Sequence, residues 1–285
     1  MHSGTTGQGN LATVTMQLAT KAIEMASDTS PHRAPEGERR WSLANMLPAA
    51  RVLIGQGSEA DRDVIEELAW GLTDTINSPG GRVTDGFGHT RPIYAWFAIY
   101  QLGTAAWSIG DHGAVAMLAD AVERLFKHPS ASSDSDPRLA AWHHLLASFH
   151  GIRYEAPLPP STDEPAPLMP LGMNDLIDAW TYRELVGLHG LYLHGLLRSD
   201  ADRLHRAQHA AAYHLGHTQP DYTTYQPWGL AAFAADPMTA VFAEQQLHDV
   251  ATHLSIEGPG GAVMPALLLA DSAAAMSGTL TQIWR

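Results

Sequence analysis

The chain has 285 residues, with 17 lysines and arginines, 30 aspartates and glutamates, 16 histidines and no cysteine, for a formal net charge of −13. This length supports one large domain or two small ones, and the lack of cysteine excludes disulfides, cysteine zinc sites, iron–sulfur clusters and thiol nucleophiles. The acidic balance argues against nucleic acid or an anionic membrane as a partner, because phosphate binding needs concentrated lysine and arginine.

The start of the chain predicts neither a secretory signal nor a membrane anchor. Residues 1–9 are polar, and we expect them to form a disordered tail. The longest uncharged apolar stretch, 93–109, is interrupted by Gln, Gly, Thr and Ser, whereas a membrane-spanning helix needs about 20 predominantly apolar residues. We therefore expect a cytoplasmic protein with no membrane partner.

Most of the chain has the apolar spacing of helices. Val64, Leu68, Leu72 and Ile76 recur at helical intervals, whereas runs with strand periodicity are nearly absent. Residues that favour helix starts, such as Ser58, precede several of these segments. In chain order, the expected helices are 10–27, 38–55, 59–77, 91–108, 112–127, 137–150, 174–197, 200–216, 227–235, 237–255 and 259–276.

These helices are of two kinds. Four are amphipathic, with charged or amide side chains on one side: 59–77, 112–127, 200–216 and 237–255. Three are apolar nearly all round: 91–108, 174–197 and 259–276. A helix of the first kind faces water on one side, whereas a helix of the second kind is surrounded by protein. The chain therefore alternates outer and inner helices, as a closed ring of helical hairpins requires.

In this alternation the chain resembles the α/α toroids, an architecture shared by six-hairpin glycosidases, several polysaccharide lyases, and terpenoid cyclases and prenyltransferases. The resemblance covers about residues 10–276. It implies an all-α fold, a single domain over 1–285 with about six hairpins. Only five outer helices are found, because the sixth falls at 151–173, where repeated prolines prevent a helix. We expect this segment to run extended along the outside; the alternative is a linker between two helical domains.

Two long loops precede inner helices and carry most of the candidate chemistry. In a toroid such loops emerge at one end of the ring, and long loops on a rigid scaffold commonly form binding sites. The loop 78–92 contains four glycines, but it meets no nucleotide-binding fingerprint, because no strand precedes it and no Gly-Lys-Ser/Thr follows. The loop 217–228 is dense in hydrogen-bonding and aromatic residues. A purely structural role is the alternative for both loops.

The residue types in these loops fit carbohydrate chemistry. Glycoside hydrolysis needs two carboxyl groups about 5–10 Å apart, for which Asp85 and Asp221 are the candidates. A β-eliminating lyase would instead use Tyr as base and acid, with His and an amide at a uronate carboxylate. The remaining catalytic candidates are His89, His217, Tyr222 and Tyr225. The substrate-binding candidates are Trp228, Gln226, Gln219, Phe87, Trp41, Arg82, Asp175 and Glu257.

Other functions remain open at this point. The chain has no Asp-Asp pair, so it lacks the aspartate-rich motifs of terpenoid cyclases, but a toroid with an apolar pocket is one alternative. A non-catalytic binding or scaffold protein is the other. His205 and His209 share a helix face without the glutamate of a His-Glu-x-x-His zinc site. We therefore expect no metal and no cofactor, and a small-molecule or carbohydrate ligand as the partner.

Overall fold

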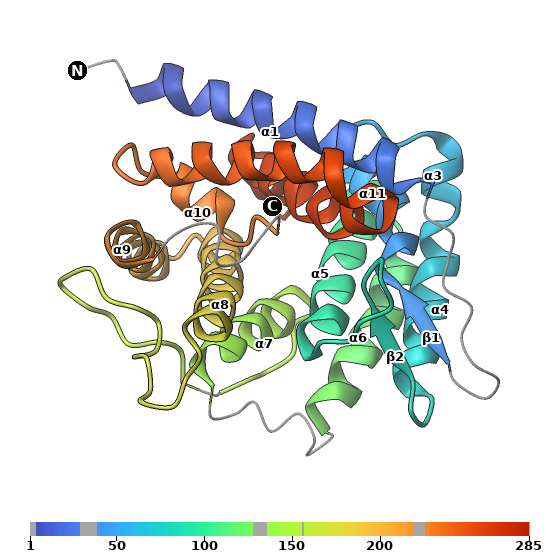
Figure 1. The fold of residues 1–285 in the computed structure, drawn as a ribbon. Coiled ribbons are helices and arrows are strands. Elements are labelled where there is room, and N and C mark those ends of the chain that lie inside the picture. Colours follow the sequence, from blue (N-terminus) through green and yellow to red (C-terminus); the bar gives the residue numbers. More distant parts are fainter. Residues whose placement is uncertain (1–3, 29–38, 128–135, 156, 219–225, 285) are drawn as a thin grey trace.

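The fold is all-α, as expected. The structure, a computed structural model, describes residues 4–28, 39–127, 136–155, 157–218 and 226–284. Its helices are α1 (Gly4–Ala26), α2 (Leu47–Leu53), α3 (Glu59–Asp63), α4 (Ile65–Asn77), α5 (Pro92–Ile109), α6 (His112–Lys127), α7 (Pro137–Phe149), α8 (Ile177–Arg198), α9 (Ala201–His217), α10 (Leu230–Ala234), α11 (Ala240–Met276) and α12 (Thr279–Ile283) (Figure 1). Within the described ranges, strand is limited to β1 (Arg40–Ser42) and β2 (Arg82–Thr84), which pair in parallel.

Three segments differ from the sequence-based expectation. Helix α1 begins at Gly4, so the expected tail over 1–9 is too long. The segment 38–55 is not one helix but β1, the 3₁₀ helix η1 (Leu43–Met46) and α2. The Ser42 side chain accepts a hydrogen bond from the Ala44 N–H, which starts the 3₁₀ turn directly after the strand. The expected helix 59–77 is divided into α3 and α4 at Val64.

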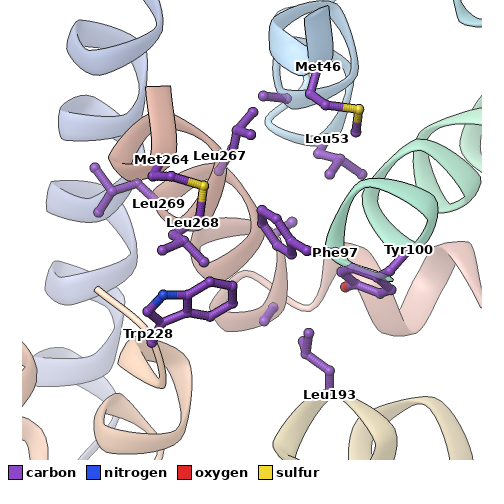
Figure 2. Packing of buried hydrophobic residues seen from close by; sticks show 14 of the residues in the cluster. Met46, Leu53, Phe97, Tyr100, Leu193, Trp228, Met264, Leu267, Leu268 and Leu269 are labelled. Atoms are coloured by element: carbon purple, nitrogen blue, oxygen red, sulfur yellow. The ribbon is translucent and has the colours of Figure 1, made fainter. Parts of the chain in front are cut away.

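The core lies among the helices that are apolar on all sides. In Figure 2, Phe97 and Tyr100 of α5 face the 267–269 stretch of α11 and Trp228, which precedes α10. The rings of Phe97 and Trp228 lie 5.2 Å apart at an interplanar angle of 65°. Each large side chain buried in this way contributes about 1.5–3 kcal/mol of transfer free energy. The three stretches expected to be apolar nearly all round, 91–108, 174–197 and 259–276, are thus mostly buried in the structure, within α5, α8 and the second part of α11.

Helices from distant parts of the chain pack side by side. Helix α1 lies along α11, so the first and last long helices are partners (Figure 1). Helix α4 packs on α6, and α8 packs on both α7 and α9. By length and composition α11 is the one described helix that could cross a membrane, but 78% of its apolar window is buried inside the protein.

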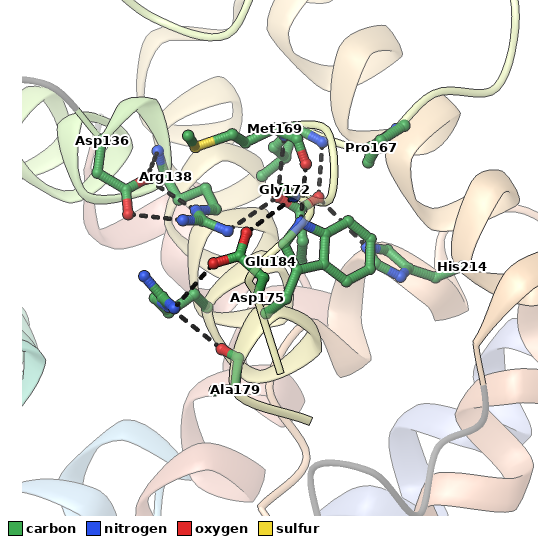
Figure 3. A network of polar contacts seen from close by, with 12 residues as sticks. Asp136, Arg138, Pro167, Met169, Gly172, Asp175, Ala179, Glu184 and His214 are labelled. Atoms are coloured by element: carbon green, nitrogen blue, oxygen red, sulfur yellow. Dashed lines mark hydrogen bonds and ion pairs between the residues drawn. The ribbon is translucent and has the colours of Figure 1, made fainter. Parts of the chain in front are cut away.

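Residues 151–173, here called the proline-rich segment, contain no helix in their described part. Two buried side chains, Arg206 and Glu184, hold this segment; Figure 3 shows Glu184 beside Met169. Arg206 of α9 donates to three of its carbonyls, those of Pro160 (2.7 Å), Ala166 (3.0 Å) and Pro167 (2.6 Å). Glu184 of α8 accepts from the N–H groups of Leu168 (2.6 Å) and Met169 (2.9 Å). Backbone groups that would pair within a helix are thus satisfied by side chains of α8 and α9.

Candidate functional site

The two loops chosen from the sequence contribute to one cavity. This first cavity has a volume of about 160 Å³ and lies between the loop after β2, the start of α5, Gln226 and a corner in α11. Its lining residues are Asp85, Phe87, His89, Arg91, Tyr94, Gln226, Gly260, Gly261, Met264 and Pro265. The loop 78–92 and the end of the loop 217–228 therefore meet around a common space.

Close backbone contact between two glycines brings the loop to α11. Gly258 has φ 68°, a left-handed conformation that breaks α11 into two helical parts. Just after this break, Gly260 meets Gly86 at the tip of the loop. A Cβ atom added at Gly86 would lie 2.1 Å from the Gly260 carbonyl oxygen, which no side chain tolerates. The absence of both side chains therefore lets the loop close this wall of the cavity.

Asp85 is the buried centre of the loop. Its Oδ1 accepts hydrogen bonds from the N–H groups of Phe87 and His89, both at 2.9 Å. Its Oδ2 accepts from the Tyr94 hydroxyl at 3.3 Å and lies 3.4 Å from His89 Nδ1. Three donors thus hold the carboxylate, and the oxygen that accepts from Tyr94 also faces His89, whose side chain is 73% exposed. The arrangement is an Asp–His pair with the imidazole reaching toward solvent.

Two tyrosines stand behind this pair. Burial raises the pKa of Tyr94 well above its ordinary value, and the nearby Tyr182 and Asp85 raise it further. Burial also raises the pKa of Tyr182 to about 12, against the opposing effect of the Arg91 guanidinium. That guanidinium lies 4.1 Å from the centre of the Tyr182 ring. Both phenols therefore remain protonated at neutral pH; Tyr94 acts as a hydrogen-bond donor to Asp85, and the Tyr182 ring supports Arg91.

The structure brings together four of the residues chosen from the sequence: Asp85, Phe87, His89 and Gln226. It adds Arg91 and Tyr94, which were not among the site residues predicted from the sequence. Arg91 directly precedes Pro92, the first residue of α5, and Tyr94 lies in the first turn of that helix. Their position at the start of an apolar helix, directly after the loop, is the signal from which they could have been predicted.

Trp228 and Trp41 do not line the cavity, contrary to the prediction that they bind substrate. Trp228 is fully buried among Phe97 and other core rings. Its Nε1 donates to Gln226 Oε1 at 3.2 Å, so this tryptophan positions a cavity residue instead. Trp41 is buried in β1 opposite Val83. A tryptophan in or beside a loop is as well suited to the core as to sugar stacking, and here both tryptophans are part of the core.

Four other candidates also lie outside the cavity lining. Arg82 is an exposed residue of β2, and Asp175 accepts a hydrogen bond from the Gly172 N–H (2.9 Å) before α8 begins. Glu257 lies at the α11 corner, behind Gly261. His217 ends α9, where it is exposed and stacks on Tyr213 at 4.1 Å. The remaining candidates, Gln219, Asp221, Tyr222 and Tyr225, lie outside the described residues.

A buried polar network lies in the core beneath Trp228. Asp271 of α11 accepts from the Tyr100 hydroxyl (2.8 Å) and from His189 Nε2 (2.7 Å). The other ring nitrogen of His189, Nδ1, accepts from the Gly229 N–H (3.2 Å). Since a backbone N–H can only donate, Nδ1 of His189 is the acceptor from Gly229, and Nε2 is the ring nitrogen that donates to Asp271. This network joins α5, α8, α11 and the start of α10, and so fixes the turn that carries Gln226 and Trp228.

The chain matches no protein-family model, and no curated protein or solved structure matches it. Across the described part of the chain, no group of three or more His, Asp or Glu side chains is placed to hold a metal ion. The geometry therefore defines an all-α protein with a polar cavity built around an Asp–His pair, an arginine and an amide.

Proposed function

We propose that the chain is a single-domain α/α toroid of about six helical hairpins, with the first cavity at the end where the inner helices start. The packing of α1 on α11 supports a closed ring, because it joins the first hairpin to the last. The proline-rich segment takes the place of one outer helix. The first turn of α5 borders the cavity, as an inner helix should in this arrangement.

We further propose that the first cavity cleaves a glycosidic bond in a carbohydrate-like ligand that carries a carboxylate. The observation that carries this proposal is the joint presence of Asp85, His89, Arg91 and Gln226 around one space. Asp85 is the only carboxylate among the described lining residues, which favours β-elimination over hydrolysis by two carboxyl groups. The polar lining favours a hydroxyl-rich ligand over the apolar ligand of a terpenoid cyclase.

In this mechanism Arg91 pairs with the carboxylate of a uronate ring, and Gln226 hydrogen-bonds to it. His89 Nε2 removes the proton at C5, while Asp85 stabilises the imidazolium through Nδ1. The C4–O4 bond breaks as the C4–C5 double bond forms, and the His89 imidazolium returns the proton to O4. Tyr94 is a positioning residue, because its hydroxyl holds the Asp85 carboxylate in place.

The test is an activity assay on matched neutral and uronate-containing oligosaccharides, with two readouts. Elimination produces both new reducing ends and the ultraviolet absorbance of an unsaturated uronate, whereas hydrolysis produces reducing ends alone. We expect both signals from the uronate set, and a loss of about 100-fold or more for Asp85→Asn and His89→Gln. The exposed His248 provides the control His248→Gln, which should keep full activity.

If reducing ends form without the ultraviolet absorbance, the bond is cleaved by hydrolysis and the elimination mechanism is wrong. Cleavage that persists in both site variants would remove Asp85 and His89 from the mechanism. If neither oligosaccharide set is cleaved, the proposed activity is wrong and the non-catalytic alternative takes its place.

A further inference from the structure

A second cavity, of about 310 Å³, adjoins the first, and Arg91 lines both. Its walls come from the beginnings of α5, α7 and α8. The lining combines apolar side chains, Ile93, Leu139 and Val186, with three arginines, Arg91, Arg138 and Arg183. Such a combination suits a ligand that has an apolar body and an anionic group.

The three arginines differ in how their charge is balanced. Arg138 is 3% exposed and lies between Asp136 (2.8 Å) and Glu184 (3.6 Å), so its charge is compensated (Figure 3). Arg183 lies 3.9 Å from Asp175. Arg91 has no carboxylate of the described residues within 4.0 Å and rests instead on the Tyr182 ring. Among the described residues, Arg91 is therefore the one arginine of this cavity without a carboxylate partner, in a chain whose net charge is −13.

Two further features of the lining favour an anion. The cavity is bordered by the first turns of three helices, whose N-terminal ends carry partial positive charge. The Tyr182 hydroxyl is buried and makes no hydrogen bond of good geometry to a described residue, although the side chains of Arg91 and Trp228 lie close enough to oppose the rise in its pKa that burial causes. A buried polar atom without a partner costs about 1–3 kcal/mol, which a ligand oxygen would relieve.

The apolar surface continues beyond the cavity along α8. Leu176 precedes Ala179 by three residues, which places both on one face of the helix start. Leu176 is 77% exposed although it is a large aliphatic side chain. Ala179 lines the cavity and is exposed, so it lies between the interior and this apolar rim. A ligand with an apolar body thus has contact surface from Leu176 inward to Val186.

We propose that the second cavity binds an organic carboxylate with an apolar ring or chain. The carboxylate pairs with Arg91 and reaches the Tyr182 hydroxyl. The apolar body packs on Ile93, Leu139 and Val186. This site does not depend on the catalytic steps proposed for the first cavity, because binding alone defines it.

The test is calorimetric titration of the full chain with cyclohexanecarboxylate and with its neutral amide. We expect the carboxylate to bind about tenfold more tightly than the amide, since a charge-assisted contact with arginine is lost in the amide. Arg91→Met keeps an unbranched apolar stem but removes the charged guanidinium, and should weaken carboxylate binding about tenfold. Ala179→Phe, at an exposed helix position, should block the cavity and abolish binding. Arg153→Met removes an exposed arginine outside both cavities and should bind as the unmodified chain does.

Ala179→Phe also separates the two cavities, because Ala179 lines only the second. If this variant binds normally while Arg91→Met does not, the carboxylate occupies the first cavity and the proposal is wrong. Equal affinity for the acid and the amide, or no binding of the acid at all, would also overturn it. Loss of oligosaccharide cleavage plays no part in these readouts, so the two proposals fail independently.

Discussion

His150, which directly follows α7, is a half-buried histidine whose ring nitrogens are both buried, and its replacement should stabilise the protein. Its ring packs against Phe149 at 4.9 Å and faces α5 near Gly103. Both ring nitrogens are buried without a hydrogen-bond partner among the described residues. Burial lowers the pKa of His150 from 6.5 to about 4. The folded protein therefore keeps a neutral imidazole under mildly acidic conditions in which the unfolded chain protonates it.

The sign and size of the effect follow from this difference. Because the pKa is lower in the folded state, the unfolded chain binds the proton first. Above pH 6.5 His150 therefore has no pH-dependent effect on the free energy of unfolding, and this free energy falls as the pH is lowered from 6.5 toward 4. At about pH 5 the proton taken up by the unfolded chain costs about 2 kcal/mol of folding stability at this residue. His150→Leu removes that cost and also removes the unpaired nitrogens, worth about 1 kcal/mol or more at any pH.

Urea unfolding at about pH 8 and about pH 5 measures the effect. We expect the free energy of unfolding of His150→Leu to exceed that of the unmodified chain by about 1 kcal/mol at the higher pH and about 3 kcal/mol at the lower pH. His248→Leu is the control, because His248 is exposed in the folded chain. Between the two pH values, this variant should lose as much free energy of unfolding as the unmodified chain does. The reasoning is refuted if His150→Leu loses as much stability on acidification as the unmodified chain does.

Three more substitutions test the contacts that build the site and its support. Gly86→Ala places a methyl group against the Gly260 carbonyl and should cost about 1–3 kcal/mol in thermal unfolding, with loss of ligand binding in the first cavity; unchanged binding would contradict the close contact. Arg206→Met removes three hydrogen bonds to the proline-rich segment and should speed limited proteolysis there, while lowering stability by about 2–4 kcal/mol. Asp271→Val leaves the buried Tyr100 hydroxyl and the His189 Nε2–H without their shared acceptor, so stability should fall by about 1–3 kcal/mol in urea unfolding.

The longer helices could be predicted from the sequence because each carries its own apolar period, whereas short helices such as α3 carry none. The two strands could not, since three residues are too few to show an alternation. The break at Gly258 was expected in position, because two helices were assigned on either side of it. What the sequence does not contain is the way in which α4 and α6, or α1 and α11, pack together.

The candidate site was predictable only where its chemistry is local. Asp85 and His89 lie four residues apart in a loop that is too polar to be a simple connection. Tyr94 was missed because it lies in an apolar helix, where an aromatic residue is normally part of the core. Asp271 was missed because its partner Tyr100 is 171 residues away in the chain. No local pattern shows that a buried carboxylate has a donor at such a distance.

The pairing of α1 with α11 has a consequence for synthesis of the chain. Helix α1 ends at Ala26, whereas its partner starts at Ala240. At ribosomal rates the delay between these two points is roughly 10–40 s. During that time the face of α1 that packs on α11 has no native partner, so the first helix to be made is among the last to be covered. Contacts of such long range also slow folding, and a nascent chain of this protein should depend on chaperones that shield its N-terminal helix until α11 has emerged.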